Sequence, residues 1–329
     1  MRLHSLLTVV PGLLAGLVLP TDVRADPWAM PGDMAFRHDV QVLADAGVVL
    51  SPVTAWPIPW ATLAADLEDN APGESAPLTV RGAYARVSNR LQAVRQADGI
   101  QLNTRLAGST SPRSIRTFEN KPRDDGELQA GASWQGDRFA IRAQATAVSD
   151  PEDGKNVRLD GSYGALVLGN HIFSAGLIDR WWGPGWDASL IYSTNARPIP
   201  AVSVERNVSA AFETRWLSWI GPWTYSFVYG LLDDDRVIND AQFLGFRVAA
   251  RPFRDFEIAL TRTAQWCGDD RPCDFDTFVD LVVGKDNRGD EGIDLDNEPG
   301  NQLAAVDMRW NSPVFDANYA VYTQWTAED

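Results

Sequence analysis

From Ile100 onward, the sequence alternates apolar and polar side chains over successive segments of about ten residues. Successive side chains of a β-strand point to opposite faces, so each such segment has one apolar and one polar face. In the segment 139–147, Phe139 and Ile141 alternate with Arg142 and Gln144. A soluble β-sandwich also alternates, but its strands are shorter and its exposed face carries fewer aromatic side chains. The pattern therefore favours an all-β, transmembrane antiparallel β-barrel.

The alternation predicts about twelve strands, separated by turn residues. We expect them near residues 100–109, 127–135, 138–149, 158–169, 171–182, 186–193, 200–207, 223–232, 240–251, 254–266, 301–311 and 314–326. Their polar faces are expected to line the interior of the barrel, with the charged residues Arg105, Arg142, Arg247, Arg251, Glu257, Asp307 and Arg309. Tryptophans near the strand ends suit the aromatic girdles of such barrels, namely Trp134, Trp181, Trp223, Trp266, Trp310 and Trp325.

The first 99 residues differ from the rest of the chain. Residues 1–25 have the pattern of a secretory signal peptide, with Arg2 before an apolar core and a small-residue cleavage site at Val23–Ala25. No later stretch reaches the roughly 20 apolar residues of a transmembrane helix. We therefore expect export to the cell outer membrane, with a periplasmic helical bundle over 26–99 and the barrel over 100–329.

Helical spacing of apolar residues supports this bundle. It predicts helices over Ala35–Val49, Trp60–Leu67 and Leu78–Ala97, with Trp56-Pro-Ile-Pro-Trp60 as a rigid turn. The bundle is expected either to bury its own apolar stripes as an independent unit, or to act as a plug or periplasmic docking piece. The sequence alone leaves these roles open, and they are compatible, because a plug also buries its own apolar stripes.

The stretch 177–206 combines tryptophans with glycine and proline. Gly183-Pro184-Gly185 predicts a sharp turn between two strands, since glycine tolerates positive φ and proline fixes φ. Aromatic faces and planar polar side chains suit sugar rings, so we select Trp181, Trp182, Trp186, Asn195 and Arg197 as candidate polysaccharide-binding residues. The alternative is structural: the corner packs inside the barrel, and Arg197 pairs with a carboxylate.

Four motifs resemble the capsule-assembly outer-membrane protein family called Wzi. They are FRHDVQVLADAGVV and TAWPIPW near the N-terminus, RWWGPGWDASLIYSTNARPIPAVSVER in the middle, and EPGNQLAAVDMRW at 298–310. The resemblance implies a larger barrel with a helical bundle at its periplasmic mouth, and a lectin-like role in retaining or organising capsular polysaccharide or exopolysaccharide. On this basis we expect a C-terminally truncated member, a genuinely smaller barrel being the alternative.

Residues 267–300 are expected to form a long acidic surface loop. Cys267 and Cys273 lie in an exported chain, so we predict a disulfide between them, and a metal site is the weaker alternative because no second Cys or His pair has zinc spacing. The carboxylates of Asp294, Asp296 and Glu298 alternate, which allows divalent-ion binding, but a solvated loop is the simpler interpretation. We predict no metal and no cofactor.

Composition narrows the function further. The net charge of −15 argues against nucleic acid as a partner, because phosphate neutralisation needs a basic patch. Only three histidines are present and no G-x-S-x-G motif occurs, so we predict that the protein is not an enzyme. The alternatives are a porin or substrate channel and, less favoured, a surface hydrolase. Expected partners are capsular polysaccharide or exopolysaccharide, outer-membrane lipid and lipopolysaccharide, with the protein as a monomer.

Overall fold

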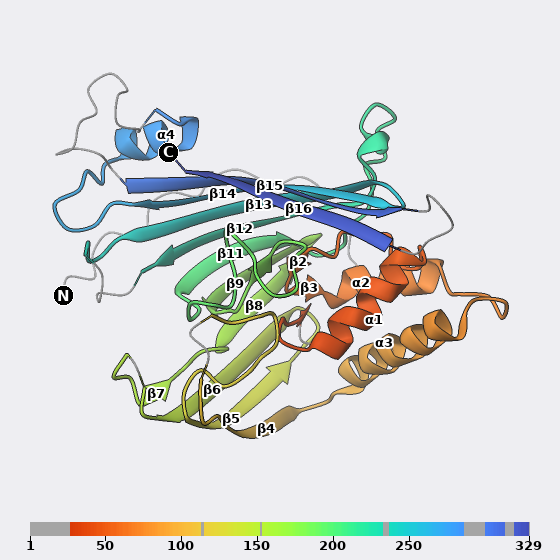
Figure 1. Ribbon diagram of the computed structural model, residues 1–329, viewed down its shortest axis with the longest axis horizontal. Coiled ribbons are helices and arrows are strands. Elements are labelled where there is room, and N and C mark those ends of the chain that lie inside the picture. The colour runs from red at the N-terminus through yellow and green to blue at the C-terminus, as the bar shows by residue number, and fades with distance from the viewer. Residues whose placement is uncertain are drawn as a thin grey trace.

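The computed structural model describes residues 27–112, 115–151, 153–232, 237–285, 300–312 and 319–328. The predicted signal peptide over 1–25 lies outside these residues, as do Asp294, Asp296 and Glu298 of the predicted acidic loop. A single curved sheet dominates the described chain, and three helices lie at one end of its concave side (Figure 1).

The sheet has twelve strands, all paired antiparallel to their neighbours in the order β16-β15-β14-β13-β12-β11-β9-β8-β6-β5-β4, with β7 beside β6. Among the described residues it is not closed, and β4 and β16 form its two edges. The strands are β4 (Ile100–Gly108), β5 (Gly126–Gln135), β6 (Phe139–Ser149), β7 (Val157–Arg158), β8 (Tyr163–Leu168), β9 (His171–Leu177), β11 (Pro200–Arg206), β12 (Trp223–Leu231), β13 (Gln242–Phe253), β14 (Phe256–Trp266), β15 (Gly300–Ser312) and β16 (Tyr319–Glu328).

The sheet is apolar outside and polar inside. On the outer face Leu102, Ile141 and Leu260 are exposed, whereas the inward-facing Arg247 and Asp307 are each only 1% exposed. A soluble sheet places its apolar face on a core and its polar face in water, so this arrangement is reversed. Lipid is the solvent that stabilises such an outer face. The predicted fold class, a transmembrane antiparallel β-barrel sheet with a small helical bundle, is confirmed.

The helices follow the predicted spacing closely. They are α1 (Met34–Asp45), α2 (Trp60–Asp69) and α3 (Leu78–Gln96). Asp33 caps α1, because its Oδ1 accepts a hydrogen bond from the Phe36 amide at 2.9 Å and satisfies one of the free amides of the first turn. Leu43, Leu63 and Val87, one from each helix, are completely buried in a shared core. None of the described helices is both long enough and apolar enough to cross a membrane.

Short strand pairs join the N-terminal segment to itself and to the corner after β9. β1 (Trp28–Ala29) pairs with β3 (Ile58–Pro59), and β2 (Ala55–Trp56) pairs with β10 (Trp181–Trp182). The remaining helix, α4 (Phe275–Val283), follows β14 at the opposite end of the sheet from the bundle (Figure 1). We call these two ends the bundle end and the loop end.

Three strand predictions need correction. The segment 186–193 is not a strand, because the chain turns into the interior at Gly183, and its β-bridge joins Trp182 and Tyr192. The predicted strand 158–169 is divided into β7 and β8. The predicted strand 171–182 is divided into β9 and β10, and β10 pairs with β2 outside the large sheet. Two predicted girdle residues are buried: Trp181 lies in the interior, and Trp266 lies on the outer face of β14, where Phe278 of α4 covers it at a centroid distance of 5.3 Å.

Candidate functional site

The corner formed by residues 181–186 lies in the interior of the curved sheet. Trp181 and Trp182 are 0% and 1% exposed. The ring of Trp181 meets Phe118 edge-on with a centroid distance of 5.6 Å, and Phe118 meets Trp56 in the same way at 5.2 Å. Two loop-end connections, one after β4 and one after β9, therefore fold inward and join the core of the helical bundle.

Arg37 of α1 binds this corner through hydrogen bonds and aromatic contacts. Its Nη2 donates hydrogen bonds to the carbonyl oxygens of Pro184 and Gly185 at 3.1 and 2.8 Å. The guanidinium also lies over the rings of Phe118 and Trp186, 4.3 and 4.7 Å from their centroids, as in cation–π contacts. Burial lowers the pKa of Arg37 to about 9, which still leaves it charged at neutral pH.

Sequence reasoning missed Arg37 and Phe118. A signal for Arg37 was present, because it lies at the helical spacing of the buried residues Val40 and Ala44 and so interrupts an otherwise apolar face. Phe118 lies in an irregular connection with no periodicity, so only the folded chain places it beside the corner.

Charged residues of the inner sheet face hold the N-terminal segment. Glu257 accepts hydrogen bonds from the amides of Val53 and Thr54 and from the Thr54 hydroxyl, at 2.6–3.1 Å. Arg251 donates to the carbonyl oxygens of Val49 and Ala44, both at 2.7 Å. Arg309 forms an ion pair with Asp45 at 2.7 Å. These interior side chains are thus bound by the protein's own N-terminal segment.

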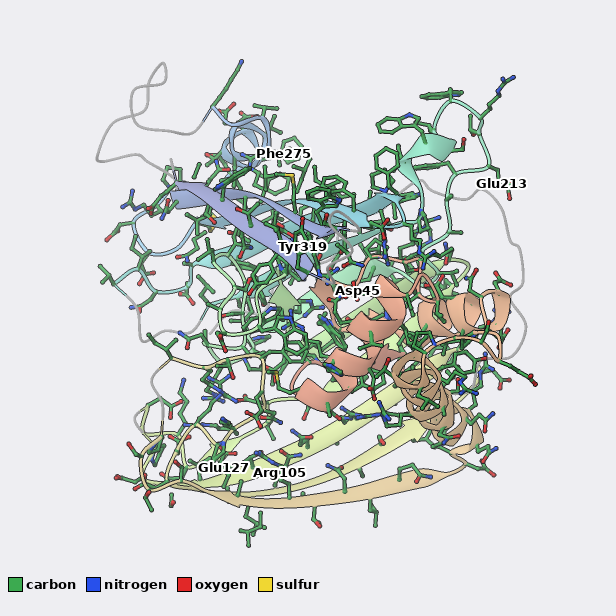
Figure 2. All side chains as sticks on the ribbon, turned by 45° about the vertical axis from the view of Figure 1, so that its right-hand side comes forward. Asp45, Arg105, Glu127, Glu213, Phe275 and Tyr319 are labelled. Carbon is green, nitrogen blue, oxygen red and sulfur yellow. A yellow bond between two sulfur atoms is a disulfide. The ribbon has the colours of Figure 1, made fainter. Side chains whose placement is uncertain are left out.

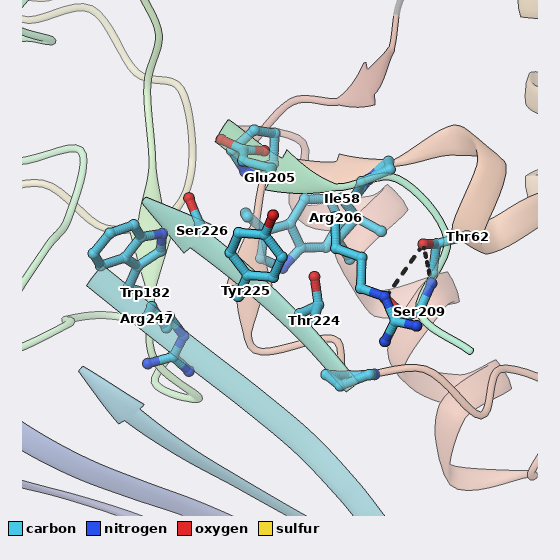
Figure 3. Close-up of a pocket in the computed structure, with 15 residues that line it drawn as sticks. Ile58, Thr62, Trp182, Glu205, Arg206, Ser209, Thr224, Tyr225, Ser226 and Arg247 are labelled. Carbon is cyan, nitrogen blue, oxygen red and sulfur yellow. Dashed lines mark hydrogen bonds between the residues drawn. The ribbon is translucent and has the colours of Figure 1, made fainter. Parts of the chain in front are cut away.

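Arg247 and Asp307 form a buried ion pair on the same face. Nη1 and Nη2 of Arg247 lie 2.6 and 3.0 Å from the two Asp307 oxygens, and Arg247 also donates to the hydroxyls of Thr261 and Thr54. Beside this pair Figure 3 shows the gap between the N-terminal segment and the sheet, with Trp182, Tyr225 and Arg247 around it. Its volume is about 20 Å³, room for roughly one water molecule. Little space is therefore left between the N-terminal segment and the sheet at this pair.

The other predicted interior residues lie toward β4–β6. Arg105 pairs with Glu127 at 3.1 Å and donates to the Asn120 carbonyl oxygen at 3.0 Å. Arg142 places its guanidinium over the Tyr163 ring, 5.4 Å from the centroid. Whether any of the seven predicted residues lines an open lumen stays a prediction.

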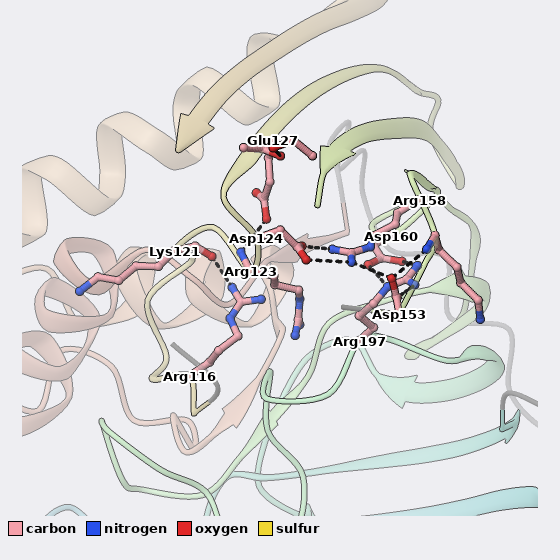
Figure 4. Close-up of polar contacts among 12 residues, drawn as sticks. Arg116, Lys121, Arg123, Asp124, Glu127, Asp153, Arg158, Asp160 and Arg197 are labelled. Atoms are coloured by element: carbon pink, nitrogen blue, oxygen red, sulfur yellow. Dashed lines mark hydrogen bonds and ion pairs between the residues drawn. The ribbon is translucent and has the colours of Figure 1, made fainter. Parts of the chain in front are cut away.

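Asn195 and Arg197 lie at the loop end, away from the three tryptophans. Arg197 forms a bidentate salt bridge with Asp160, in which Nε and Nη2 each lie 2.8 Å from a carboxylate oxygen. Its Nη1 lies 2.7 Å from an Asp153 oxygen (Figure 4). The pairing of Arg197 with a carboxylate, which belongs to the structural alternative for this stretch, is present. The Asn195 Oδ1 accepts a hydrogen bond from the Arg116 amide at 2.9 Å. The five candidate residues thus separate into an interior group and a loop-end group.

Arginines order the loop-end group. Arg123 donates to the carbonyl oxygens of Thr194, Asn195 and Ala196 at 2.7–3.0 Å, and so fixes the backbone between β10 and β11. Arg116 donates to the Lys121 carbonyl oxygen at 2.7 Å. Burial raises the pKa of the Asp179 carboxyl, although Arg123 and Arg116 oppose this shift. A cavity of about 220 Å³ adjoins this group and is lined by Ser109, Ser111, Arg116, Thr117, Glu119 and Lys121.

We expect the contacts of Asp153 to survive mild acid. Partial burial raises the pKa of Asp153, but hydrogen bonds from Arg158, the Lys155 amide and Arg197 outweigh it and hold this pKa well below its usual range. A depressed pKa stabilises the fold above the unfolded value of about 4, and the stabilisation is lost as pH falls through the folded value. Amide protection over 194–197, corrected for intrinsic exchange, should stay constant from pH 7 to about pH 4 and fall below it. The Asp153→Asn variant should lack this acid-dependent fall. A fall beginning near pH 6 in the wild type would contradict the assignment.

The predicted disulfide between Cys267 and Cys273 is confirmed. Just after it, Asp274 caps α4 through its Oδ1, which accepts a hydrogen bond from the Thr277 amide at 2.9 Å. Within the described part of the chain, no group of three or more His, Cys, Asp or Glu side chains is arranged to hold a metal ion. Residues 286–299 of the predicted acidic loop lie outside that part.

An antiparallel sheet with an apolar outer face, a charged inner face and an interior occupied by its own N-terminal segment defines a membrane β-barrel protein. The model of the capsule assembly protein Wzi family matches residues 96–329, and the chain belongs to this family.

Two known proteins resemble the chain over most of its length. A relative from Klebsiella pneumoniae, an uncharacterized 55.8 kDa protein in the cps region, is 30% identical over 303 residues, which are 90% of this chain and 57% of the relative. A solved structure of Wzi, an outer membrane protein involved in group 1 capsule assembly in Escherichia coli and a carbohydrate-binding β-barrel, is 26% identical. It superposes with a TM-score of 0.77, covering 91% of this chain and 63% of that one. The chain therefore spans less than two thirds of either protein.

Proposed function

We propose that this protein is a carbohydrate-binding outer-membrane β-barrel that retains or organises capsular polysaccharide or exopolysaccharide at the cell surface. Family membership and the similarity to Escherichia coli Wzi support this function. The observation in this chain that carries it is the contrast between inner-face side chains bound by the N-terminal segment and an ordered polar group at the loop end. An interior occupied in this way favours a surface that binds over a channel that conducts.

The loop-end group has the chemistry that sugar recognition needs. Sugars offer many hydroxyls in fixed positions, and pre-ordered polar groups bind them without a large ordering cost. Arg116, Glu119 and the serine hydroxyls supply donors and acceptors around the 220 Å³ cavity. Asn195 holds the backbone amide of Arg116, and Arg197 is fixed by two carboxylates. We place the polysaccharide here, with Asn195 and Arg197 as positioning residues. The buried Trp181 and Trp182 serve the core in this proposal.

The bundle at 26–99 faces the periplasm, and the loop end faces the cell exterior, where long connections of outer-membrane barrels usually lie. Lipid and lipopolysaccharide surround the apolar outer face, and no reaction is assigned. The monomeric state stays a prediction.

Titration of purified capsular polysaccharide into the full-length protein in detergent micelles tests this function. Wild type should bind, and Arg116→Ala and Arg197→Ala should each weaken binding about tenfold, the effect of losing one or two hydrogen bonds. Arg95→Ala on helix α3 is the matched control and should bind like wild type, because Arg95 lies in the bundle, where it pairs with Glu68 at 2.8 Å. Binding that both loop-end substitutions leave intact would move the site elsewhere. An absence of binding to any capsular or exopolysaccharide would reject the function.

A further inference from the structure

The connection between β11 and β12, residues 207–222, forms a lobe at the bundle end. It includes the short helix η1 (Ser218–Ile220). Trp216 and Trp219 of this lobe are 72% and 70% exposed, although tryptophan is costly to leave in water. Figures 1 and 2 show the lobe standing out beyond the sheet, on the side away from helices α1–α3. The two rings are therefore not part of the core that the interior tryptophans occupy.

The lobe is built to hold this shape. At its stem the Phe212 ring stacks on Trp223, with a centroid distance of 4.7 Å and an interplanar angle of 17°. Arg206 covers the same Trp223 ring at 4.0 Å and donates to the carbonyl oxygens of Ala210 and Trp223 at 2.9 and 2.7 Å. At its tip the amides of Leu217 and Ser218 both bond to the Thr214 carbonyl oxygen. Exposure of the tryptophans thus follows from an ordered backbone.

The base of the lobe joins the outer, lipid-facing surface of the sheet. The Arg251 amide of β13 donates to the Pro222 carbonyl oxygen at 2.9 Å. Gly221 has φ +69° and packs so tightly that a Cβ there would lie 2.1 Å from the Arg251 carbonyl oxygen. Phe253, two residues further along β13, is 70% exposed on the outside. The exposed tryptophans therefore continue an apolar surface at the point where the strands end.

The position of the lobe at the strand ends and its residue types fit one partner, the headgroup region of a lipid bilayer. Tryptophan concentrates at the headgroup level of a bilayer, where its ring contacts acyl chains and its N–H contacts polar groups. The exposed Arg215 precedes Trp216 and suits a lipid phosphate. We propose that residues 215–220 insert into the headgroup region of the membrane leaflet at the bundle end and fix the depth of the barrel in the bilayer. The inference rests on the membrane placement of the sheet.

Spin labels on single cysteines test this proposal. Both cysteines of the chain are joined in a disulfide, so an introduced cysteine offers a unique thiol. Labels go on Ser218→Cys, which keeps both tryptophans, and on Glu213→Cys, an exposed position of the same lobe (Figure 2). A third label on Leu260→Cys marks the outer face of β14. The full-length protein is reconstituted into vesicles of phosphatidylethanolamine and phosphatidylglycerol, and collisions with oxygen and with a water-soluble nickel chelate are measured.

We expect the nickel chelate to reach position 218 several-fold less often than position 213, with position 260 the least accessible. If the chelate reached positions 213 and 218 equally often while position 260 stayed protected, the inference would be overturned. A protein partner would then be the candidate that covers the lobe. A label at 260 that the chelate reaches freely would reject the membrane placement itself, and the proposed function with it.

Discussion

Replacing Arg37 with alanine is expected to release the corner at 183–186 from helix α1. The substitution removes two charge-assisted hydrogen bonds to the Pro184 and Gly185 carbonyl oxygens and the stacking on Phe118 and Trp186. Hydrogen bonds from a charged group contribute about 1.5–3 kcal/mol each, and cation–π contacts about 0.5–2 kcal/mol. These terms are not additive, so we expect the corner to lose about 3 kcal/mol of local stability, or roughly a hundredfold more opening.

Hydrogen exchange of the amides at 181–186, measured on the protein in detergent micelles, reports this opening. Arg37→Lys keeps a charge without the planar fork and should recover only part of the protection. Arg81→Ala changes an exposed arginine of helix α3 and should leave the corner unchanged. Wild-type exchange rates in the Arg37→Ala variant would show that the corner is held by the sheet alone.

Removing one partner of the Arg247–Asp307 pair is expected to have the largest effect on global stability. Both side chains are about 1% exposed, and Asp307 is the acidic partner of Arg247. Asp307→Ala leaves the buried guanidinium without its counter-charge, which costs about 3–5 kcal/mol. The midpoint of the unfolding transition in urea, followed after reconstitution into lipid vesicles, should shift to a lower urea concentration by this free energy divided by the m value.

The double variant Arg247→Met/Asp307→Leu separates charge burial from packing. An apolar pair of similar volume no longer needs compensation, so the double variant should be more stable than Asp307→Ala alone. Loss of the hydrogen bonds to Thr54 and Thr261 limits the recovery. A cost below about 1 kcal/mol for Asp307→Ala would show that water or another residue satisfies Arg247.

Strands and helices were predictable because their signals are local. The alternation of β6 and the helical stripe of α1 each lie within about a dozen residues, and both appear near the predicted positions. The path after β9 was not predictable in the same way. Residues 186–193 have a strand-like composition. However, Arg37 and Phe118, which are distant in sequence, donate hydrogen bonds to the Gly185 and Trp186 carbonyl oxygens and hold the chain in the interior. Tertiary contacts override local propensity at this point.

The candidate site shows the same limit. Asn195 and Arg197 were identifiable as polar residues in a stiff, proline-rich stretch, and the pairing of Arg197 with a carboxylate was one of two alternatives, without its partners. The partners, Asp153 and Asp160, lie about 40 residues earlier in another connection. Arg116 and Arg123 carried no motif, because irregular loops have no period to mark an inward side chain. The sugar-binding role of the candidates stays a prediction.

We propose that this protein is a plugged barrel that binds polysaccharide at its surface. Conductance of planar bilayers containing the full-length wild-type protein tests that claim most directly. The N-terminal segment and the corner occupy the inner side of the described sheet, so we predict no stepwise conductance above the lipid baseline. Stable, porin-sized steps from the wild-type protein would contradict the account and favour a substrate channel.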